Sequence, residues 1–211
     1  MLRRAAELGF LGGRDVDEHI AHARAHAVAA GLTGGVAVGG VAVGGAAAEP
    51  MRVCDLGAGG GVPGLVVALD HPSVSITLLE RSERCCAFLD RAVDDLGLAD
   101  RVEVLLADAA DAAHEPDHRG AYDVVLSRSF GPPAATAECG AALLGAGGLL
   151  VVSEPPTVER SRWPPAPLAG LGLELERRVG PEPNFVVLRL VSPCPAGRPR
   201  PWAQIVKRPL Y

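Results

Sequence analysis

Short apolar runs alternate with stretches of helical periodicity along most of this chain. In the segment 83–96, apolar residues recur every three or four positions, which predicts an amphipathic helix, and a second helix is predicted near 134–144. Strands are predicted at 75–80, 102–106, 122–126 and 149–153. Strands that alternate with helices favour a parallel, doubly wound α/β sheet.

Two further strand candidates, 171–179 and 185–191, lie near the end of the chain and are joined by Gly-Pro-Glu-Pro-Asn. A connection this short cannot carry a crossover, so the two strands must pair antiparallel. The pattern therefore predicts a mostly parallel sheet that is closed by one antiparallel strand.

The segment 53–64 carries the most informative motif. An apolar run ends at Asp55, and a proline at position 63 opens the helix predicted at 65–69. Glycines occupy alternate positions between them: Gly57, Gly59 and Gly61. Glycine lets backbone amides approach a ligand closely, and proline suits the first turn of a helix. The spacing Asp-x-Gly-x-Gly-x-Gly resembles the first motif of the S-adenosylmethionine-dependent methyltransferases. The resemblance implies a Rossmann-like class I fold, with a seven-stranded, mostly parallel sheet, and S-adenosylmethionine as the cofactor.

The same glycines also fit a second pattern. Gly59, Gly61 and Gly64 spell G-x-G-x-x-G, which is the dinucleotide fingerprint. Asp55 would repel a pyrophosphate, whereas it suits the cationic amino-acid end of the methyl donor. A dinucleotide site and a turn that serves packing alone are the alternatives at this point.

Polar side chains mark the ends of the predicted strands. Ligands of such sheets bind at the carboxyl ends of the strands, which places Asp55, Glu80, Asp108 and Arg128 around one crevice. Glu80 lies about twenty residues beyond the glycine turn, where an acid accepts hydrogen bonds from ribose hydroxyls. Asp108, or the backbone of Ala109 and Ala110, would meet the adenine edge. The alternatives are a solvated strand end for Glu80 and an ordinary surface turn for Asp108.

The residues after the strand predicted at 122–126 narrow the class of molecule that could accept the methyl group. Methylation of an exocyclic amine usually needs Asn/Asp-Pro-Pro-Tyr/Phe at this point, but the chain has Ser-Arg-Ser-Phe at 127–130. Carbon methylation needs an activated cysteine, and the Pro-Cys at 193–194 is far from that position. An acceptor with its own lone pair, such as a purine ring nitrogen, needs no general base. Alignment of donor and acceptor then supplies most of the catalysis.

Three segments together resemble the glucose-inhibited division protein B family. They are Asp-Leu-Gly-Ala-Gly-Gly-Gly-Val-Pro-Gly at 55–64, Ser-Arg-Ser-Phe at 127–130 and Val-Lys-Arg-Pro-Leu at 206–210. The resemblance covers residues 51–152 and the final dozen, and it implies methylation of guanine N7 in small-subunit (16S) ribosomal RNA. It also implies a catalytic position for Arg128, near donor and acceptor. The donor-contacting positions that it implies are Gly57, Val62, Ala109, Ala110 and Arg128.

The predicted N-terminal helix departs from the family pattern. The family usually has a histidine followed by an Asp-Ser pair, whereas this chain keeps His19 and has His22 and Ala23 in place of the pair. His19, His22 and His26 fall on one helical face. Without carboxylate or thiolate support, we expect no metal there, and histidines on a solvated face are the simpler interpretation.

The end of the chain is basic although the whole is acidic. The formal net charge of −5 is poor for a general RNA binder. No acid follows Glu182, however, and Trp202 and Tyr211 lie among the last cations. The predicted RNA-binding residues are Arg198, Arg200, Lys207 and Arg208. A solvated, partly packed tail is the alternative.

The length of 211 residues suits one α/β domain with a short extension. We expect a helical extension and a Gly/Ala/Val-rich linker at 1–50, then a methyltransferase domain with its basic tail at 51–211. The five cysteines show no C-x-x-C spacing, which is typical of reduced thiols in the cytoplasm. No signal peptide is recognised, and the uncharged stretch 27–48 is too rich in glycine for a membrane span.

Other functions stay open on the sequence alone. The altered N-terminal helix and the net acidity favour a small-molecule methyltransferase that has kept the family core. A non-catalytic donor-binding or assembly protein is a second alternative, and a nicotinamide oxidoreductase is a more distant one. The leading prediction is a ribosomal RNA methyltransferase with a small-subunit RNA partner.

Overall fold

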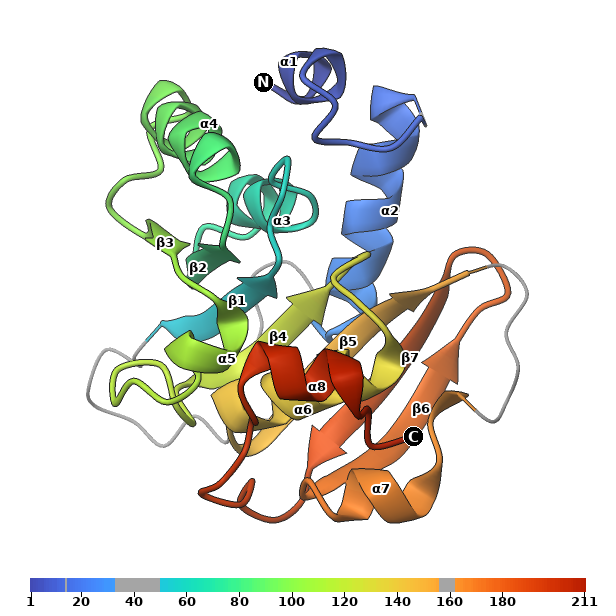
Figure 1. Cartoon of the computed structure of the whole chain (residues 1–211). Helices are drawn as coiled ribbons and strands as arrows, with labels where there is room; N and C mark the ends of the chain where they lie inside the picture. Colours follow the sequence, from blue (N-terminus) through green and yellow to red (C-terminus); the bar gives the residue numbers. More distant parts are fainter. Residues whose placement is uncertain (14, 33–49, 156–161) are drawn as a thin grey trace, which may run out of the picture.

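The computed structural model describes residues 1–13, 15–32, 50–155 and 162–211. Seven strands form one sheet in the order β3-β2-β1-β4-β5-β7-β6 (Figure 1). β7 runs antiparallel to both of its neighbours, and the pairs among β1 to β5 are parallel. The predicted class I sheet with one antiparallel strand is therefore confirmed. The strands are β1 Met51–Leu56, β2 Val74–Glu80, β3 Val102–Leu106, β4 Tyr122–Ser127, β5 Leu144–Glu154, β6 Leu173–Val179 and β7 Asn184–Leu190.

The helices cover both faces of the sheet. Apolar residues of α2, α3 and α4 pack on one face, and those of α5, α6, α7 and α8 pack on the other (Figure 1). Strands such as β4 and β7 are buried on both faces and are mostly hydrophobic, whereas the edge strand β6 is largely exposed and carries four charged residues. The helices are α1 Leu2–Glu7, α2 Val16–Ala29, α3 Gly64–Asp70, α4 Glu83–Asp95, α5 Ala109–Ala112, α6 Pro133–Leu143, α7 Pro165–Ala169 and α8 Trp202–Lys207.

Local sequence signals set two helix starts at the carboxyl edge of the sheet. The Ser82 hydroxyl accepts a hydrogen bond from the amide of Cys85 and caps α4. The Asp108 carboxylate accepts one from the amide of Ala110 and caps α5. Such caps satisfy amides that have no partner within the helix. They fix where the chain turns from strand to helix, which is where the pocket described below lies.

β5 begins earlier than the sequence predicts. The sequence predicts a helix that ends near residue 144 and a strand at 149–153, but the glycine-rich segment 145–148 between them lies inside β5. The pairing with β4 shifts register between Tyr122 and Val124, and Gly147 has φ of 78°. The segment is therefore an irregularity within the strand, because glycine permits a backbone that other residues adopt at a cost.

The first 32 residues pack on the rest of the structure through Phe10, which meets Phe88 of α4, and through α2. This helix contacts α3, β5 and β7. The Gly/Ala/Val-rich linker lies outside the described residues, so the division of the chain at residue 50 stays a prediction. Among the helices of the described residues, none is long and apolar enough to cross a membrane.

Candidate functional site

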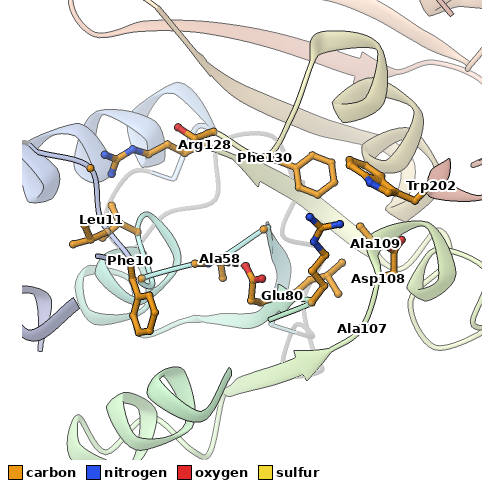
Figure 2. Close-up of a pocket in the computed structure, with 18 residues that line it drawn as sticks. Phe10, Leu11, Ala58, Glu80, Ala107, Asp108, Ala109, Arg128, Phe130 and Trp202 are labelled. Atoms are coloured by element: carbon orange, nitrogen blue, oxygen red, sulfur yellow. Dashed lines mark hydrogen bonds between the residues drawn. The ribbon is translucent and has the colours of Figure 1, made fainter. Parts of the chain in front are cut away.

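A cavity of about 310 Å³ opens at the carboxyl ends of β1, β2, β3 and β4 (Figure 2). This is the edge at which doubly wound sheets bind ligands, and the volume lies near the lower end of small-molecule pockets. Seven of the predicted donor-binding residues line it: Gly57, Gly59, Val62, Glu80, Asp108, Ala109 and Arg128. The strand ends therefore converge as the sequence predicts.

The glycine turn forms the floor of the cavity beside β1. The amides of Gly57 and Ala58 both donate to the carbonyl oxygen of Leu79, which ties the turn to β2. Gly57 has φ of 76°, and a Cβ added there would lie 2.8 Å from Cδ2 of Phe130. A side chain at position 57 would thus strain the backbone and displace an aromatic ring of the pocket.

Glu80 points its carboxylate at the glycine turn (Figure 2). One carboxylate oxygen accepts a hydrogen bond of 3.0 Å from the amide of Gly59, and the other accepts one of 2.9 Å from the amide of Ser82. Each carboxylate oxygen has a further lone pair, so the group can still accept hydrogen bonds from a ligand. Asp108 uses one oxygen to cap α5 and also lines the cavity.

Asp55 lies beneath the cavity rather than in its wall. Its side chain is 1% exposed, and its carboxylate accepts a hydrogen bond of 2.7 Å from the amide of Gly64 at the start of α3. Burial raises the pKa of Asp55 to about 7, although the Gly64 hydrogen bond works in the opposite direction. Gly61 packs against Leu65, and Ala110 is buried. These three predicted donor-binding residues do not line the cavity, and their part in donor binding stays a prediction.

Arg128 reaches the cavity from the end of β4 (Figure 2). Its Nη2 donates to Nδ1 of His19 at 2.6 Å, and Nε2 of His19 lies 3.1 Å from the carbonyl oxygen of Gly12. An arginine only donates and a carbonyl only accepts, so these contacts require a neutral His19 that carries its proton on Nε2. The next residue, Ser129, has φ of 60°, a costly backbone for a non-glycine residue that is typical of functional sites.

The histidines of α2 are buried, so the interpretation as a solvated face is wrong. Exposed fractions are 0% for His19 and His26 and 9% for His22. The rings of His22 and His26 pack on Phe185 at 5.2 and 4.8 Å. His26 lies 2.8 Å from the carbonyl oxygen of Val151, and burial lowers its pKa to about 3. The histidine face of α2 lies against the sheet because the imidazoles contact Val151 and Phe185 there. Among the described residues, no group of three or more His, Cys, Asp or Glu side chains could hold a metal ion.

Residues from the two ends of the chain complete the cavity. Phe10 and Leu11 lie on one side, while Phe130 and Trp202 lie on the other (Figure 2). Gly12 also lines the cavity. The Phe130 and Trp202 rings meet edge to face at 5.4 Å. In the sequence, Phe130 belongs to the Ser-Arg-Ser-Phe motif and Trp202 lies among the tail cations, but nothing predicts a place in the cavity for residues 10–12. Their only signal was a phenylalanine in a chain with few aromatics. Trp163, the other tryptophan of the chain, is 3% exposed and belongs to the core.

Two arginines of the basic tail form ion pairs with a buried glutamate. Glu138 of α6 is fully buried, and its carboxylate accepts hydrogen bonds from side-chain nitrogens of Arg198 and Arg200. Burial opposes ionisation of Glu138, but these hydrogen bonds outweigh it, so its pKa lies below the ordinary value. Lys207 and Arg208 are exposed at the end of α8. Two of the four predicted RNA contacts thus have a structural partner within the protein.

The sheet order and the pocket at its carboxyl edge define a class I methyltransferase fold. The structure is similar to the crystal structure of the cyclase SpnF, with a TM-score of 0.56 and 21% identity over 76% of this chain and 58% of that chain. It is also similar to a predicted O-methyltransferase from Agrobacterium tumefaciens, with a TM-score of 0.52 and 25% identity over 69% of this chain and 76% of that chain.

Comparison of the sequence with known proteins shows the family to which the chain belongs. Residues 41–154 match the model of the GidB family, which is described as rRNA small subunit methyltransferase G. Ribosomal RNA small subunit methyltransferase G of Roseiflexus castenholzii is 35% identical over 168 residues, which are 76% of this chain and 71% of the relative. The protein of that name from Prochlorococcus marinus strain MIT 9313 is 33% identical over 178 residues, covering 78% and 70%. The chain belongs to the GidB family, which confirms the resemblance found in the sequence.

Proposed function

We propose that this chain transfers a methyl group from S-adenosylmethionine to N7 of a guanine in small-subunit ribosomal RNA. Membership of the GidB family supports the reaction and the RNA class. The observation that carries the proposal is the pocket itself. It brings the glycine turn, Glu80 and Arg128 together at the carboxyl edge of a class I methyltransferase sheet. The reaction would take place in the cytoplasm, where ribosomal subunits are assembled.

The residues present fit the methyl donor. The Glu80 carboxylate keeps free lone pairs for ribose hydroxyls while two backbone amides hold it in place. Asp108 and Ala109 line the neighbouring wall, where the adenine would lie, and Gly57 and Gly59 leave room for the amino-acid end. When bound, the donor supplies an electrophilic methyl group on a sulfonium. The protein has to hold that group and exclude competing nucleophiles.

The cavity walls suit an acceptor that already carries a lone pair. None of the five cysteines lines the cavity, and burial raises the pKa of Cys54 and of Cys86, the latter to about 11. These thiols stay protonated, which disfavours a thiolate nucleophile for carbon methylation. Arg128 is held by His19 at the edge where donor and acceptor would meet. Its role is to position the acceptor and to stabilise charge there.

Transfer of labelled methyl tests the proposal directly. Small-subunit RNA, assembled small subunits lacking the modification, and a metabolite extract are each incubated with the protein and labelled donor. We expect label in one of the RNA samples, recovered as N7-methylguanosine after digestion to nucleosides. Label confined to metabolites would refute the RNA acceptor, and no turnover on any acceptor would point to a non-catalytic protein.

A small-molecule methyltransferase is the second candidate. Two observations favour it: the net charge of −5, and the pairing of Arg198 and Arg200 with Glu138, which removes two cations from a tail expected to bind phosphates. The family core would then serve a smaller acceptor in the same cavity. Such an enzyme would show no salt-dependent affinity for RNA, since that dependence arises from phosphate contacts.

A further inference from the structure

Two arginines flank the start of α4, beside residues that line the cavity. Arg81 follows Glu80 directly and lines the cavity, and Arg84 lies three residues further along. Both side chains are exposed. The guanidinium carbon of Arg81 lies 5.7 Å from the ring centroid of Trp202, and that of Arg84 lies 5.1 Å from the ring centroid of Phe10. The same helix start therefore contacts both terminal segments that line the cavity.

Both rings are fixed in place by other contacts. Phe10 meets Phe88 of α4 at 5.5 Å, so the N-terminal ring is packed against the helix that carries Arg84. Trp202 meets Phe130 at 5.4 Å. It begins α8 two residues after Arg200, which is bonded to Glu138. The arginines and the rings thus form two preorganised pairs on opposite sides of one opening.

Many of the other arginines are engaged with carboxylates. Arg24 pairs with Asp70, while Arg177 and Arg189 pair with Glu176. Arg162 and Arg178 lie within ion-pair distance of Glu154. Arg81 and Arg84 instead stack on aromatic rings, where the nitrogen edge of a guanidinium stays available to a further acceptor. A planar guanidinium binds a phosphate with two parallel hydrogen bonds, so this geometry suits a phosphate ligand.

We propose that Arg81 and Arg84 bind phosphates of single-stranded acceptor RNA on either side of the target nucleotide, and that Trp202 and Phe10 receive unstacked bases. The inference rests on the proposed function, and it moves the main RNA contact from the C-terminal tail to the start of α4. Proteins that bind single-stranded nucleic acid combine cations along the backbone with aromatic platforms for bases. These four residues supply both elements beside the cavity in which the methyl donor would bind.

A salt series tests the phosphate contacts. The wild-type protein, Arg81→Ala, Arg84→Ala and the double variant are titrated with small-subunit RNA and with a short unstructured oligonucleotide that contains guanine. Each lost phosphate contact should flatten the log–log slope of affinity against salt by about 0.7, so the double variant should lose about 1.4. Arg81→Lys and Arg84→Lys keep the charge and should keep the slope. Arg91→Ala, on the same helix seven residues beyond Arg84, is the matched control and should leave the slope unchanged.

A second pair of variants tests the rings. Trp202→Leu and Phe10→Leu should weaken RNA binding about five- to 150-fold at every salt concentration, since stacking is worth about 1–3 kcal/mol per base. Their salt slopes should equal that of the wild type. The chain has two tryptophans, and Trp163 is buried, so quenching of tryptophan fluorescence by RNA should disappear in Trp202→Leu. Thermal unfolding of each variant checks that the fold is intact.

The outcomes separate this inference from the proposed function. Flattened slopes for the two alanine variants, with an unchanged slope for Arg91→Ala, support the inference. Equal slopes for the wild type and the double variant overturn it, even when the wild type methylates RNA. A wild type that shows no salt-linked RNA binding overturns it as well. Methyl transfer by the wild type, measured separately, decides the proposed function alone.

Discussion

Substitution of Arg200 distinguishes a structural role from a role in RNA binding. The Arg200 side chain donates from Nε to Oε1 of Glu138 at 2.9 Å and from Nη2 to Oε2 at 2.7 Å. Its backbone amide also donates to Oε1, and Arg198 donates to the same oxygen. The Glu138 side chain is 0% exposed and that of Arg200 is 22% exposed. The pair is therefore largely shielded from water.

The expected loss of stability follows from these contacts. Arg200→Ala removes the two side-chain hydrogen bonds to Glu138 and a third from Nη1 to the carbonyl oxygen of Arg208. The backbone amide of residue 200 and the Arg198 side chain remain to stabilise the carboxylate. Removing one partner of a buried ion pair costs about 3–5 kcal/mol. Because Arg198 remains, we expect a loss near the lower end, about 3 kcal/mol. Proteins of this kind have total stabilities of about 5–15 kcal/mol, so the loss is large but leaves a folded protein.

Urea denaturation of four proteins measures this coupling. They are the wild type, Arg200→Ala, Glu138→Gln and the double variant, which together form a double-mutant cycle. We expect the double variant to be less destabilised than the sum of the single changes. Lys207→Ala, an exposed cation on the same C-terminal segment, should change stability by less than about 0.5 kcal/mol.

One result would refute the structural assignment. If Arg200→Ala kept its stability while the salt slope of RNA binding flattened, Arg200 would contact phosphate as the sequence predicts. A replacement of all four tail cations cannot make this distinction, since it breaks the Glu138 contacts and alters any RNA surface at the same time. Arg200 and Lys207 therefore have to be changed one at a time.

Three further predictions concern the cavity and its support. Gly59→Asp should abolish donor binding in calorimetry, because it places a charge and a side chain in the glycine turn at φ of 52°; unchanged binding would remove the turn from the site. Arg128→Ala should reduce methyl transfer strongly with the fold intact, and Arg128→Lys should rescue little, because an ammonium lacks the planar fork; a wild-type rate in the alanine variant would contradict this role. The neutral His26 ring, with its pKa of about 3 in the folded state against about 6.5 unfolded, contributes stability that is complete above pH 6.5 and is lost as the pH falls towards 3. His26→Gln should remove this part of the pH dependence. Asp55, whose pKa is raised to about 7, contributes the opposite pH dependence in both proteins. The measurement is therefore the difference between the urea midpoints of the variant and the wild type, followed from pH 7 to pH 4.

The path of the chain through the sheet could be predicted because its signals are local. A strand buried on both faces must be apolar along its length, a glycine turn must follow the first strand, and a five-residue link forces an antiparallel pair. Strand direction then brings Gly57, Glu80, Asp108 and Arg128 to one edge, since parallel strands end together. The start of β5 was predicted too late in the sequence because glycines occur both in turns and in irregular strands.

Only the tertiary structure decided which polar residues are buried and which segments complete the cavity. The histidines of α2 look solvated in sequence, but burial depends on partners such as Val151 and Phe185 that lie far along the chain. The pairing of Arg200 with Glu138 likewise joins residues 62 positions apart. The approach of Phe10 and Trp202 to one cavity brings together the two ends of the chain. Periodicity reports which residues share a face of one element, whereas contacts between elements depend on how the whole chain packs.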